Sequence, residues 1–363
     1  MTTLVIQKDR ILGNLEALRI HTDSMIIPVL KGNAYGLGDF ELARILSNAD
    51  VKLFGVSRLE EAERLATVLP DAEILLMSPY STEEDVEKIV NLNLTATIGS
   101  YDSAVLLNGI AEKSGVKCRV HIKFDTGMGR YGFLPEEVEK AVQAVKYLTN
   151  LEVTGCFTHL SNCFGRDKKS VLRQHTLFLG CIDTLRKAGI NPGLCHIANS
   201  AAAILYPQLR LDGVRIGSAL LGRVLVKNKL GLKKVGRLES TICDIRWLPA
   251  GHNIGYANTY KTKKPVRIAV IPVGYADGLF VEKTKDTFRF RDILRYGFSD
   301  FKLLFRSERL TCEINGKQAH ILGRVGLCSV VADISSIDCK PGDLAAFDVN
   351  PLFVNSNVER RYI

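Results

Sequence analysis

A lysine that directly follows a short apolar run is the first residue whose position could support chemistry. The run Met25–Leu30 is short enough for a buried strand, and Lys31 ends it before a turn of small residues that carries Tyr35. Most lysines at such a position are simply solvated, and that interpretation stays open here. The alternative is an amine that is partly desolvated at a strand end, loses its proton and attacks a carbonyl carbon.

Polar residues also end several later apolar runs. They are Lys123 and Asp125 with the turn Thr126–Arg130, then Thr158 and His159, then Asn199 and Ser200, and finally Arg215 with Gly217 and Ser218. If the runs are parallel strands of a barrel, their carboxyl ends meet at one mouth. Their convergence with Lys31 favours a functional site over scattered surface residues.

The groups after the last two runs could bind a phosphate. Ser200 begins a helical pattern and Ser218 follows a glycine, so hydroxyls and backbone N–H groups can meet there. Ser200 as an ordinary helix cap is the alternative. A lysine and a phosphate pocket in one barrel mouth point to pyridoxal phosphate, whose aldehyde condenses with an amine and whose ring withdraws electrons from a substrate Cα.

Arg215 bears on the chemistry that such a cofactor would support. Most enzymes of this kind place a carboxylate against the pyridine nitrogen, whereas a guanidinium cannot give up a proton near neutral pH. A ring held by Arg215 is a weaker electron sink, which favours rapid return of a proton to Cα over transamination. An ion pair between Arg215 and Asp212 is the alternative.

The scaffold for these residues follows from the apolar pattern between residues 24 and 222. Short strand-like runs alternate there with amphipathic helical stretches such as 41–49, 59–68 and 174–188. The runs are 25–30, 53–57, 73–78, 95–99, 118–125, 151–159, 194–199 and 213–219. This alternation predicts an α/β fold, a (β/α)8 TIM barrel over residues 1–229, with its chemistry at the carboxyl ends of the strands.

A different pattern follows the barrel and predicts a mainly-β domain over residues 230–363. Short runs bounded by Pro and Gly turns lie at 239–247, 254–256, 266–273, 311–315, 318–325, 328–334 and 344–348. Tyr256 and Tyr275 lie in two tyrosine-bearing stretches at its centre. Residues 281–310, rich in Phe, Arg and Lys, break the strand period and are interpreted as a partly helical insertion.

The composition is that of a globular protein with substantial cores, because 46% of the 363 residues are hydrophobic. No apolar run reaches membrane-spanning length and residues 1–10 lack a signal-peptide pattern, so we expect a soluble, cytoplasmic protein. Nine cysteines without a C-x-x-C pair suit reduced thiols and no zinc site. The net charge of +9 is spread along the chain, which suits anionic small ligands better than nucleic acid.

Together these motifs resemble the alanine racemase family of fold-type III pyridoxal phosphate enzymes. The matching segments run in family order over nearly the whole chain: VLKGNAYG at 29–36, KFDTGMGR at 123–130, TH at 158–159, NS at 199–200, VRIG at 214–217, GY at 255–256, GYADG at 274–278 and GRV at 323–325. The first two are highly specific. The resemblance implies pyridoxal 5'-phosphate as cofactor, an amino acid as substrate and no metal.

The resemblance also implies two bases. Lys31 would hold the cofactor and act on one face of Cα, while Tyr256 would act on the other face from the partner subunit of a head-to-tail homodimer. Two groups are needed because one residue cannot easily serve both faces of a planar carbanion. Nearby cations would lower the pKa of the phenol and of the amine toward neutral pH. Without the resemblance, Tyr256 would be interpreted as an ordinary strand tyrosine.

The remaining site residues implied by the resemblance hold the cofactor or the substrate. Those near the cofactor are Tyr35, Ser200, Gly217 and Ser218 at the phosphate, Arg215 at the ring nitrogen and His159 beside Arg215. Those near the substrate are Arg130, supported by Lys123, together with Tyr275 and Leu327. Relatives often carry the equivalent of Lys123 as a carbamate.

Three departures from the family pattern concern substrate selection and cofactor binding. Gly326-Leu327-Cys328 stands where the family has a Met-Asp pair, and Leu220-Leu221-Gly222 stands where it has Leu-Tyr-Gly. The tail 343–363 is shorter than usual and lacks a clear counterpart of the phosphate-contacting tyrosine. We therefore expect an active racemase with alanine as the default substrate, and serine or a longer or basic amino acid as alternatives.

Two other functions remain open at this point. One is a fold-type III amino acid decarboxylase, which uses an acid where Arg215 stands. The other is a non-catalytic pyridoxal phosphate homeostasis protein, which resembles the barrel alone and has no use for Tyr256.

Overall fold

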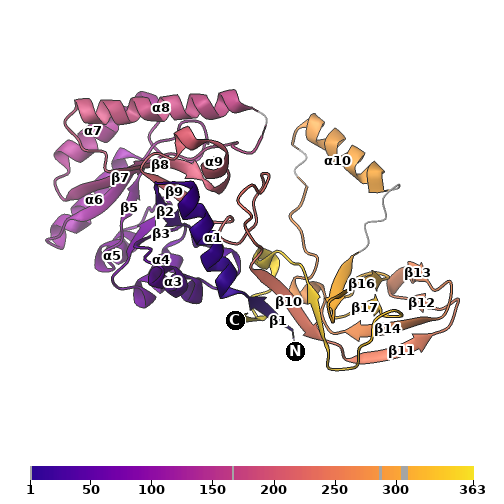
Figure 1. Cartoon of the computed structure of the whole chain (residues 1–363). Coiled ribbons are helices and arrows are strands. Elements are labelled where there is room, and N and C mark those ends of the chain that lie inside the picture. The colour runs from indigo at the N-terminus through magenta and orange to yellow at the C-terminus, as the bar shows by residue number, and fades with distance from the viewer. Residues whose placement is uncertain (1, 166, 286–287, 304–309) are drawn as a thin grey trace. The chain divides into compact units, whose positions relative to one another are not determined.

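The computed structural model describes the 363-residue chain apart from residues 1, 166, 286–287 and 304–309. The chain divides into two compact units (Figure 1). One is Lys8–Val235, and the other is Met1–Gln7 together with Gly236–Ile363. Each unit is described by itself.

The first unit is built around eight parallel strands, one for each apolar run expected from the sequence. They are β2 (Met25–Pro28), β3 (Leu53–Val56), β4 (Glu73–Leu76), β5 (Ala96–Ile98), β6 (Cys118–Lys123), β7 (Leu151–Phe157), β8 (Leu194–Asn199) and β9 (Gly213–Ile216). The order β2-β9-β8-β7-β6-β5 is continuous, β3 pairs with β4, and bridges at Val29 and Leu75 join the two parts. The ring closes through β2 and β9, so the predicted barrel is confirmed.

Helices surround this ring of strands (Figure 1). They are α1 (Lys8–His21), α3 (Asp39–Asn48), α4 (Leu59–Val68), α5 (Glu83–Asn91), α6 (Tyr101–Lys113), α7 (Val138–Tyr147), α8 (Lys168–Lys187) and α9 (Ser200–Leu205), with the short turn α2 (Lys31–Tyr35) after β2. Each buries one face; in α3, for example, Leu42, Ala43 and Leu46 are buried. Helix α1 lies before the first of the helical stretches expected from the sequence.

The buried side chains of the barrel include an apolar cluster and a set of polar residues. Apolar residues from β2, β3, β4 and β7 form one cluster: Ile27, Val29, Leu53, Leu75, Met77 and Phe157. Several polar residues are also buried in the ring, among them His121, Lys123, His196 and Arg215. Buried polar groups require partners, so these residues are tied into hydrogen bonds that also shape the floor of the site.

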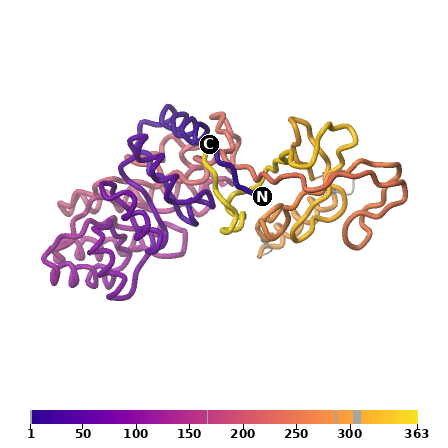
Figure 2. The backbone as a smooth tube through the Cα atoms, turned by 90° about the horizontal axis from the view of Figure 1, so that it is seen from below, coloured from indigo at the N-terminus to yellow at the C-terminus, as the bar shows by residue number. Residues whose placement is uncertain are grey.

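The second unit holds a nine-stranded sheet in the order β11-β14-β17-β16-β15-β18-β10-β1-β19. The strands are β11 (Asp244–Leu248), β14 (Val266–Ile271), β17 (Val330–Asp333), β16 (Lys317–Leu322), β15 (Thr311–Ile314), β18 (Leu344–Phe347), β10 (Gly236–Thr241), β1 (Thr3–Ile6) and β19 (Glu359–Tyr362). Neighbours are antiparallel except β1 and β19, which run parallel and lie side by side in Figure 2. The predicted mainly-β architecture is confirmed.

Two details of this unit differ from the predicted strands. The run 239–247 is broken between β10 and β11 at Ile242 and Cys243. Tyr256 begins a 3-10 turn between the short strands β12 (Asn253–Ile254) and β13 (Tyr260–Lys261), because the backbone turns at Gly255 and Ala257, with φ of 77° and 58°. The segment 281–310 contains the helix α10 (Phe290–Leu303). Across the described chain, every helix falls short of the length and apolar character that a bilayer crossing requires.

Candidate active site

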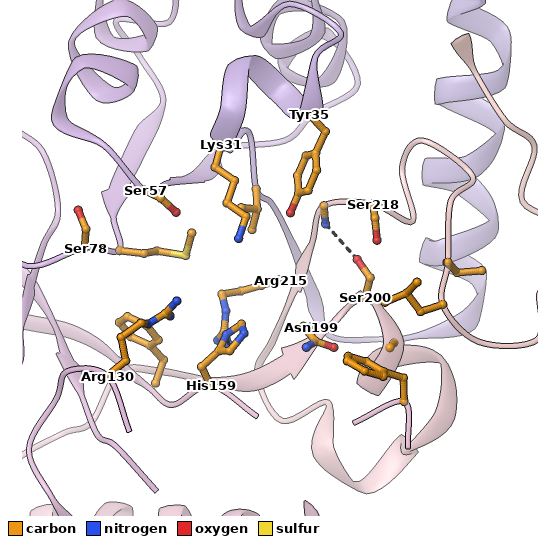
Figure 3. Close-up of a pocket in the computed structure, with 18 of the residues that line it drawn as sticks. Lys31, Tyr35, Ser57, Ser78, Arg130, His159, Asn199, Ser200, Arg215 and Ser218 are labelled. Atoms are coloured by element: carbon orange, nitrogen blue, oxygen red, sulfur yellow. Dashed lines mark hydrogen bonds between the residues drawn. The ribbon is translucent and has the colours of Figure 1, made fainter. Parts of the chain in front are cut away.

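A cavity of about 350 Å³ lies where the barrel strands end (Figure 3). It is lined by Val29, Lys31, Tyr35, Ser57, Met77, Ser78, Arg130, Tyr131, Phe157, His159, Phe164, Asn199, Ser200, Ala201, Arg215, Gly217, Ser218, Val224 and Leu225. Every barrel residue predicted to contact a cofactor or substrate is among them. The structure therefore brings together groups that are up to 187 positions apart, Lys31 and Ser218.

Lys31 enters the cavity just after β2. Figure 3 shows its amine pointing into the space, with Tyr35 on one side and Arg130 on the other. Partial burial lowers the pKa of the Lys31 amine, and the charges of Arg130 and Arg215 lower it further, while Glu61 opposes them. The neutral, nucleophilic form of the amine is therefore more populated than in an exposed lysine.

The chain after Lys31 forms a left-handed helical turn. Gly32, Asn33, Ala34 and Tyr35 have φ values of 63°, 53°, 51° and 55°. For the non-glycine residues this conformation costs about 1–2 kcal/mol each. Glu61 helps to hold the turn, because its carboxylate accepts a hydrogen bond from the Gly32 N–H at 2.6 Å and from two N–H groups just before α4.

The left-handed turn presses the Tyr35 hydroxyl against Gly217. A Cβ atom added at residue 217 would lie 2.2 Å from that hydroxyl oxygen, so only glycine fits there without displacing Tyr35. The close approach of the Tyr35 ring to the backbone after β9 thus requires glycine at position 217.

We expect Gly217→Ala to weaken pyridoxal phosphate binding about tenfold, because relieving the overlap with Tyr35 moves the hydroxyl away from the cavity. Equilibrium titration of the cofactor-free protein measures this. Gly109→Ala in α6 is the matched control, because nothing lies within 4 Å of a Cβ there. An unchanged dissociation constant for Gly217→Ala would contradict the expectation.

Ser200 connects the start of α9 to the backbone after β9. Its Oγ accepts hydrogen bonds from the N–H groups of Gly217 at 3.1 Å and Ala219 at 3.4 Å. The cap of α9 is Asn199, whose Oδ1 accepts from the Ala202 N–H at 3.1 Å. The ordinary helix-cap alternative for Ser200 is therefore wrong, and its hydroxyl instead orders the loop that borders the cavity.

These residues fit a phosphate group. The hydroxyls of Tyr35, Ser200 and Ser218 lie at the same end of the cavity in Figure 3, beside Gly217, whose missing side chain leaves room. Hydroxyl donors and closely approaching backbone are the groups that bind phosphate in proteins. The Lys31 amine stands next to this end, within the same cavity.

Arg215 is a cation buried under the cavity, 3% exposed. Its Nη1 donates to His196 Nδ1 at 2.7 Å and to the His196 carbonyl at 3.0 Å. Its Nη2 donates to the carbonyls of Thr158 at 2.8 Å and Ile197 at 3.1 Å, and lies 3.3 Å from His159 Nδ1. Five acceptors thus fix the guanidinium, and all of them are uncharged.

No carboxylate of the described residues contacts Arg215. Asp212, the alternative partner, instead accepts a hydrogen bond from the Cys195 N–H at 2.9 Å. Burial, with Arg215 as the largest of several nearby positive charges, lowers the pKa of His159 to about 3. His159 is therefore neutral at working pH and can accept from Arg215 through Nδ1.

Arg130 is positioned by a turn that Asp125 organises. The Asp125 carboxylate accepts hydrogen bonds from four consecutive N–H groups: Gly127 at 3.0 Å, Met128 at 2.7 Å, Gly129 at 3.1 Å and Arg130 at 2.7 Å. Burial by itself would raise the pKa of Asp125, but these four donors outweigh it and lower the pKa. The aspartate of this motif is therefore a structural residue that aims Arg130 at the cavity.

Lys123 lies beneath the same turn and does not line the cavity. Its Nζ donates to the carbonyls of Phe124 at 2.6 Å and Tyr131 at 3.2 Å. Burial lowers the pKa of Lys123 to about 7, with Arg215 and Arg130 adding to the effect and Asp125 opposing it. The Lys123 side chain thus supports the turn by donating hydrogen bonds to backbone carbonyls on either side of it.

Asp125→Asn should destabilise the protein by about 2 kcal/mol, because hydrogen bonds to a buried charge are lost. It should also raise the KM for the substrate, because Arg130 is no longer held. Urea unfolding and steady-state kinetics measure these effects, with Asp71→Asn on an exposed turn as the control. Since the pKa of Asp125 is lowered by folding, its stabilisation is present above about pH 4 and lost as the pH falls, so the gap between wild type and variant should narrow in acid. Equal stabilities at pH 7 would contradict this.

The other three predicted site residues lie in the second unit. Leu327 is on the loop 323–327, and the segments that carry Tyr256 and Tyr275 contact this loop. Tyr256, Tyr275 and Leu327 are 72%, 51% and 66% exposed. The Tyr275 N–H donates to the carbonyl of residue 326 at 3.1 Å, and the Ala276 N–H donates to the Leu327 carbonyl at 2.9 Å. Gly255, just before Tyr256, packs closely on Arg324. The backbone segments that carry these three residues therefore contact one another through the loop 323–327.

Two family models match this chain, and they describe the two domains of one enzyme family. The alanine racemase N-terminal domain matches residues 6–224, and the alanine racemase C-terminal domain matches residues 235–350. The chain belongs to the alanine racemase family. It is accordingly an isomerase, and the resemblance seen in the sequence motifs is confirmed.

Curated alanine racemases are similar to it over most of its length. That of Methanococcus maripaludis is 31% identical over 333 residues, which cover 90% of this chain and 83% of the relative. That of Clostridium tetani is 36% identical over 280 residues, which cover 75% of this chain and 72% of the relative.

Solved alanine racemase structures share the fold. That of Clostridium difficile 630 has a TM-score of 0.81 at 29% identity, covering 99% of this chain and 88% of that one. The structure from Bartonella henselae, described with covalently bound pyridoxal phosphate, has a TM-score of 0.80 at 24% identity and covers 100% of this chain and 99% of that one.

Sequence reasoning missed several lining residues of this alanine racemase fold. Ser57 and Ser78 lie within two residues of the ends of β3 and β4, much as Lys31 lies just after β2, so position alone could have found them. Tyr131 was missed too, and its hydroxyl donates to the Met77 carbonyl at 2.7 Å. The described residues contain no cluster of three His, Cys, Asp or Glu that could hold a metal.

Proposed function

We propose that this chain interconverts the L and D forms of an amino acid with pyridoxal phosphate, using Lys31 and Tyr256 as the two proton-transfer groups. The observation that carries the proposal is the place of Lys31 in the cavity, between a phosphate-type cradle and the buried cation Arg215, which no carboxylate of the described chain contacts. That combination suits proton transfer at Cα more than transamination or decarboxylation.

Pyridoxal phosphate fits the lining. Tyr35, Ser200 and Ser218 would hold its phosphate, Lys31 its carbonyl carbon and Arg215 its ring nitrogen. When bound, the cofactor withdraws electrons from the substrate Cα and so makes the Cα–H bond acidic. The Bartonella henselae relative, described with this group covalently bound, supports the assignment.

Lys31 moves a proton on one face of Cα, and the described residues that line the cavity offer no comparable group for the other face. Burial raises the pKa of Tyr35 to about 12 and also raises that of Tyr131, so neither phenol is a ready base. His159 has a pKa of about 3 and holds a proton too weakly. A second base from outside the barrel cavity is therefore required for racemisation.

Tyr256 is our choice for that second base, supplied by the partner subunit of a head-to-tail homodimer. Its phenol is exposed on its own unit, as are the side chains of Tyr275 and Leu327, which would border the substrate. On reaching a partner's cavity its hydroxyl would meet the positive charges of Arg130 and Arg215.

The substrate's carboxylate would bind Arg130. The guanidinium of Arg130 lies 4.9 Å from the Tyr131 ring centre, which restricts its motion. Alanine is the default substrate. An aliphatic Leu327 bordering the partner's pocket, as the family resemblance implies, would leave serine and a longer or basic amino acid as alternatives.

The test uses the purified protein loaded with pyridoxal phosphate and a panel of L-alanine, L-serine, L-lysine and L-arginine. Chiral chromatography should show the D form of at least one of them, with deuterium at Cα when the solvent is D₂O. Failure to racemise any amino acid of a wider panel would overturn the proposal. Release of carbon dioxide would assign decarboxylation instead.

A further inference from the structure

A continuous hydrogen-bonded chain of side chains runs down through the barrel from the floor of the cavity. Arg215 Nη1 lies 2.7 Å from His196 Nδ1, and His196 Nε2 lies 2.9 Å from His121 Nδ1. None of the three side chains is more than 3% exposed. The proposed mechanism uses only the first of them.

The chemistry of these groups gives the chain a direction. A guanidinium has no acceptor atom, so Arg215 donates and His196 Nδ1 accepts. A neutral imidazole that accepts through Nδ1 carries its proton on Nε2, so His196 in turn donates to His121 Nδ1. The proton of His121 is then on its Nε2. The donor Arg215 on one side and the acceptor His121 on the other therefore favour the same His196 tautomer.

Both imidazoles stay neutral. Burial, reinforced by the charge of Arg215, lowers the pKa of His196 well below its usual value and that of His121 to about 3. Because a guanidinium does not release a proton near neutral pH, the chain orients groups and does not conduct protons.

The donors of Arg215 show what this orientation controls. Nη1 and Nη2 are committed to protein acceptors, whereas Nε has no hydrogen-bond partner among the described residues. Arg215 also lines the cavity, so its remaining N–H is available to a ligand there. The imidazole of His196 therefore helps to decide which edge of the guanidinium faces the cavity.

The barrel makes room for this arrangement on β7. A Cβ added at Gly155 would lie 2.5 Å from His121 Cε1 and Nε2, so a side chain there would push the imidazole out of place. At its far end, His121 lines a second cavity of about 550 Å³ together with Glu73, Arg119 and Thr154, near the amino ends of the strands. Water in that space can accept a hydrogen bond from the Nε2–H of His121.

We propose that His121 is a positioning residue. By accepting a hydrogen bond from His196, it holds that imidazole in the tautomer that receives Arg215, and so fixes the guanidinium that meets the cofactor's ring nitrogen. This inference rests on the proposed function for the identity of the ligand, and on the hydrogen bonds alone for the tautomers.

The experiment compares two substitutions of the same residue. His121→Leu removes the acceptor, whereas His121→Asn retains a side-chain oxygen near the position of Nδ1. Imidazole ¹⁵N shifts in protein labelled at its seven histidines report the tautomers, with His196→Asn assigning the His196 signals. Titration of the cofactor-free proteins with pyridoxal phosphate gives the affinity.

Wild type and His121→Asn should show His196 with an unprotonated Nδ1 and a protonated Nε2. In His121→Leu we expect mixed tautomers and about tenfold weaker cofactor binding, because the buried Nε2–H is left without an acceptor. Gly155→Ala should reproduce this effect without altering the imidazole chemically.

Three results would overturn the proposal. They are a protonated Nδ1 of His196 in wild type, an unchanged tautomer and affinity in His121→Leu, or equal losses in His121→Leu and His121→Asn, which would indicate packing alone. The wild-type spectrum decides even if a variant fails to fold. Absence of racemisation in wild type would count against the proposed function while leaving the tautomer result intact.

Discussion

We expect Lys31→Ala to lower the rate of racemisation by roughly 10⁴-fold or more, because the proposed covalent attachment of the cofactor and one of the two proposed proton-transfer groups would both be lost. The variant should also lose the visible absorbance of the loaded protein. In wild type, borohydride reduction followed by peptide mapping should place a pyridoxyl group on residue 31. The fold should survive, because Lys31 points into a cavity and not into the core.

The pH dependence of loading gives a further check on the same residue. The pKa of Lys31 is lowered by burial, Arg130 and Arg215, and only the neutral amine attacks the cofactor's carbonyl carbon. Loading of cofactor-free protein should therefore reach half its maximal rate below the usual lysine pKa of about 10.4. Lys113→Ala on α6 is the control for both experiments. Full activity in Lys31→Ala, or a pyridoxyl group elsewhere, would reject the assignment.

Tyr256→Phe should bind the cofactor normally and lose racemisation by about 10³-fold, because only the phenolic hydroxyl is removed. Lys31 would still exchange the Cα hydrogen of one enantiomer with solvent. NMR in D₂O should accordingly show exchange of that enantiomer and almost none of the other. Tyr260→Phe, in the neighbouring strand β13, is the matched control and should be fully active.

Mixing the two inactive variants tests whether the site is shared between subunits. If Tyr256 serves its partner's cavity, a hybrid dimer of Lys31→Ala and Tyr256→Phe chains has one intact site and one doubly defective site. Random reassociation of equal amounts should recover about a quarter of the wild-type activity. No recovery despite demonstrated subunit exchange would mean that each chain uses its own tyrosine.

The barrel was predictable because its strands are short apolar runs in a regular alternation with helices, a pattern that local sequence displays. Other elements were not, because their partners are distant. β1 pairs with β10 and β19, which lie more than 200 positions away, so nothing near Thr3–Ile6 indicates a sheet. In α1, Asn14 is a poor helix former that the structure explains only through its side-chain hydrogen bonds to the carbonyls of Leu220 and Lys233.

The site shows the same division between local and distant information. The position of Lys31 and Arg215 at strand ends was readable from the chain. The left-handed turn that brings Tyr35 to Gly217 was not, because Asn33 and Ala34 adopt it only under tertiary constraint. The buried histidines 121 and 196 were overlooked because a single imidazole in an apolar run carries no sign of the hydrogen bond between them.

The closure of the barrel through β2 and β9 makes cofactor capture a sign that the barrel itself is complete. Ile27 pairs with Arg215 across that seam, which unites the earliest and the latest strand of the ring. A growing chain that has not yet reached β9 possesses the amine but lacks both the guanidinium and the phosphate loop. Binding of pyridoxal phosphate would thus distinguish chains with a closed barrel from chains that end before β9.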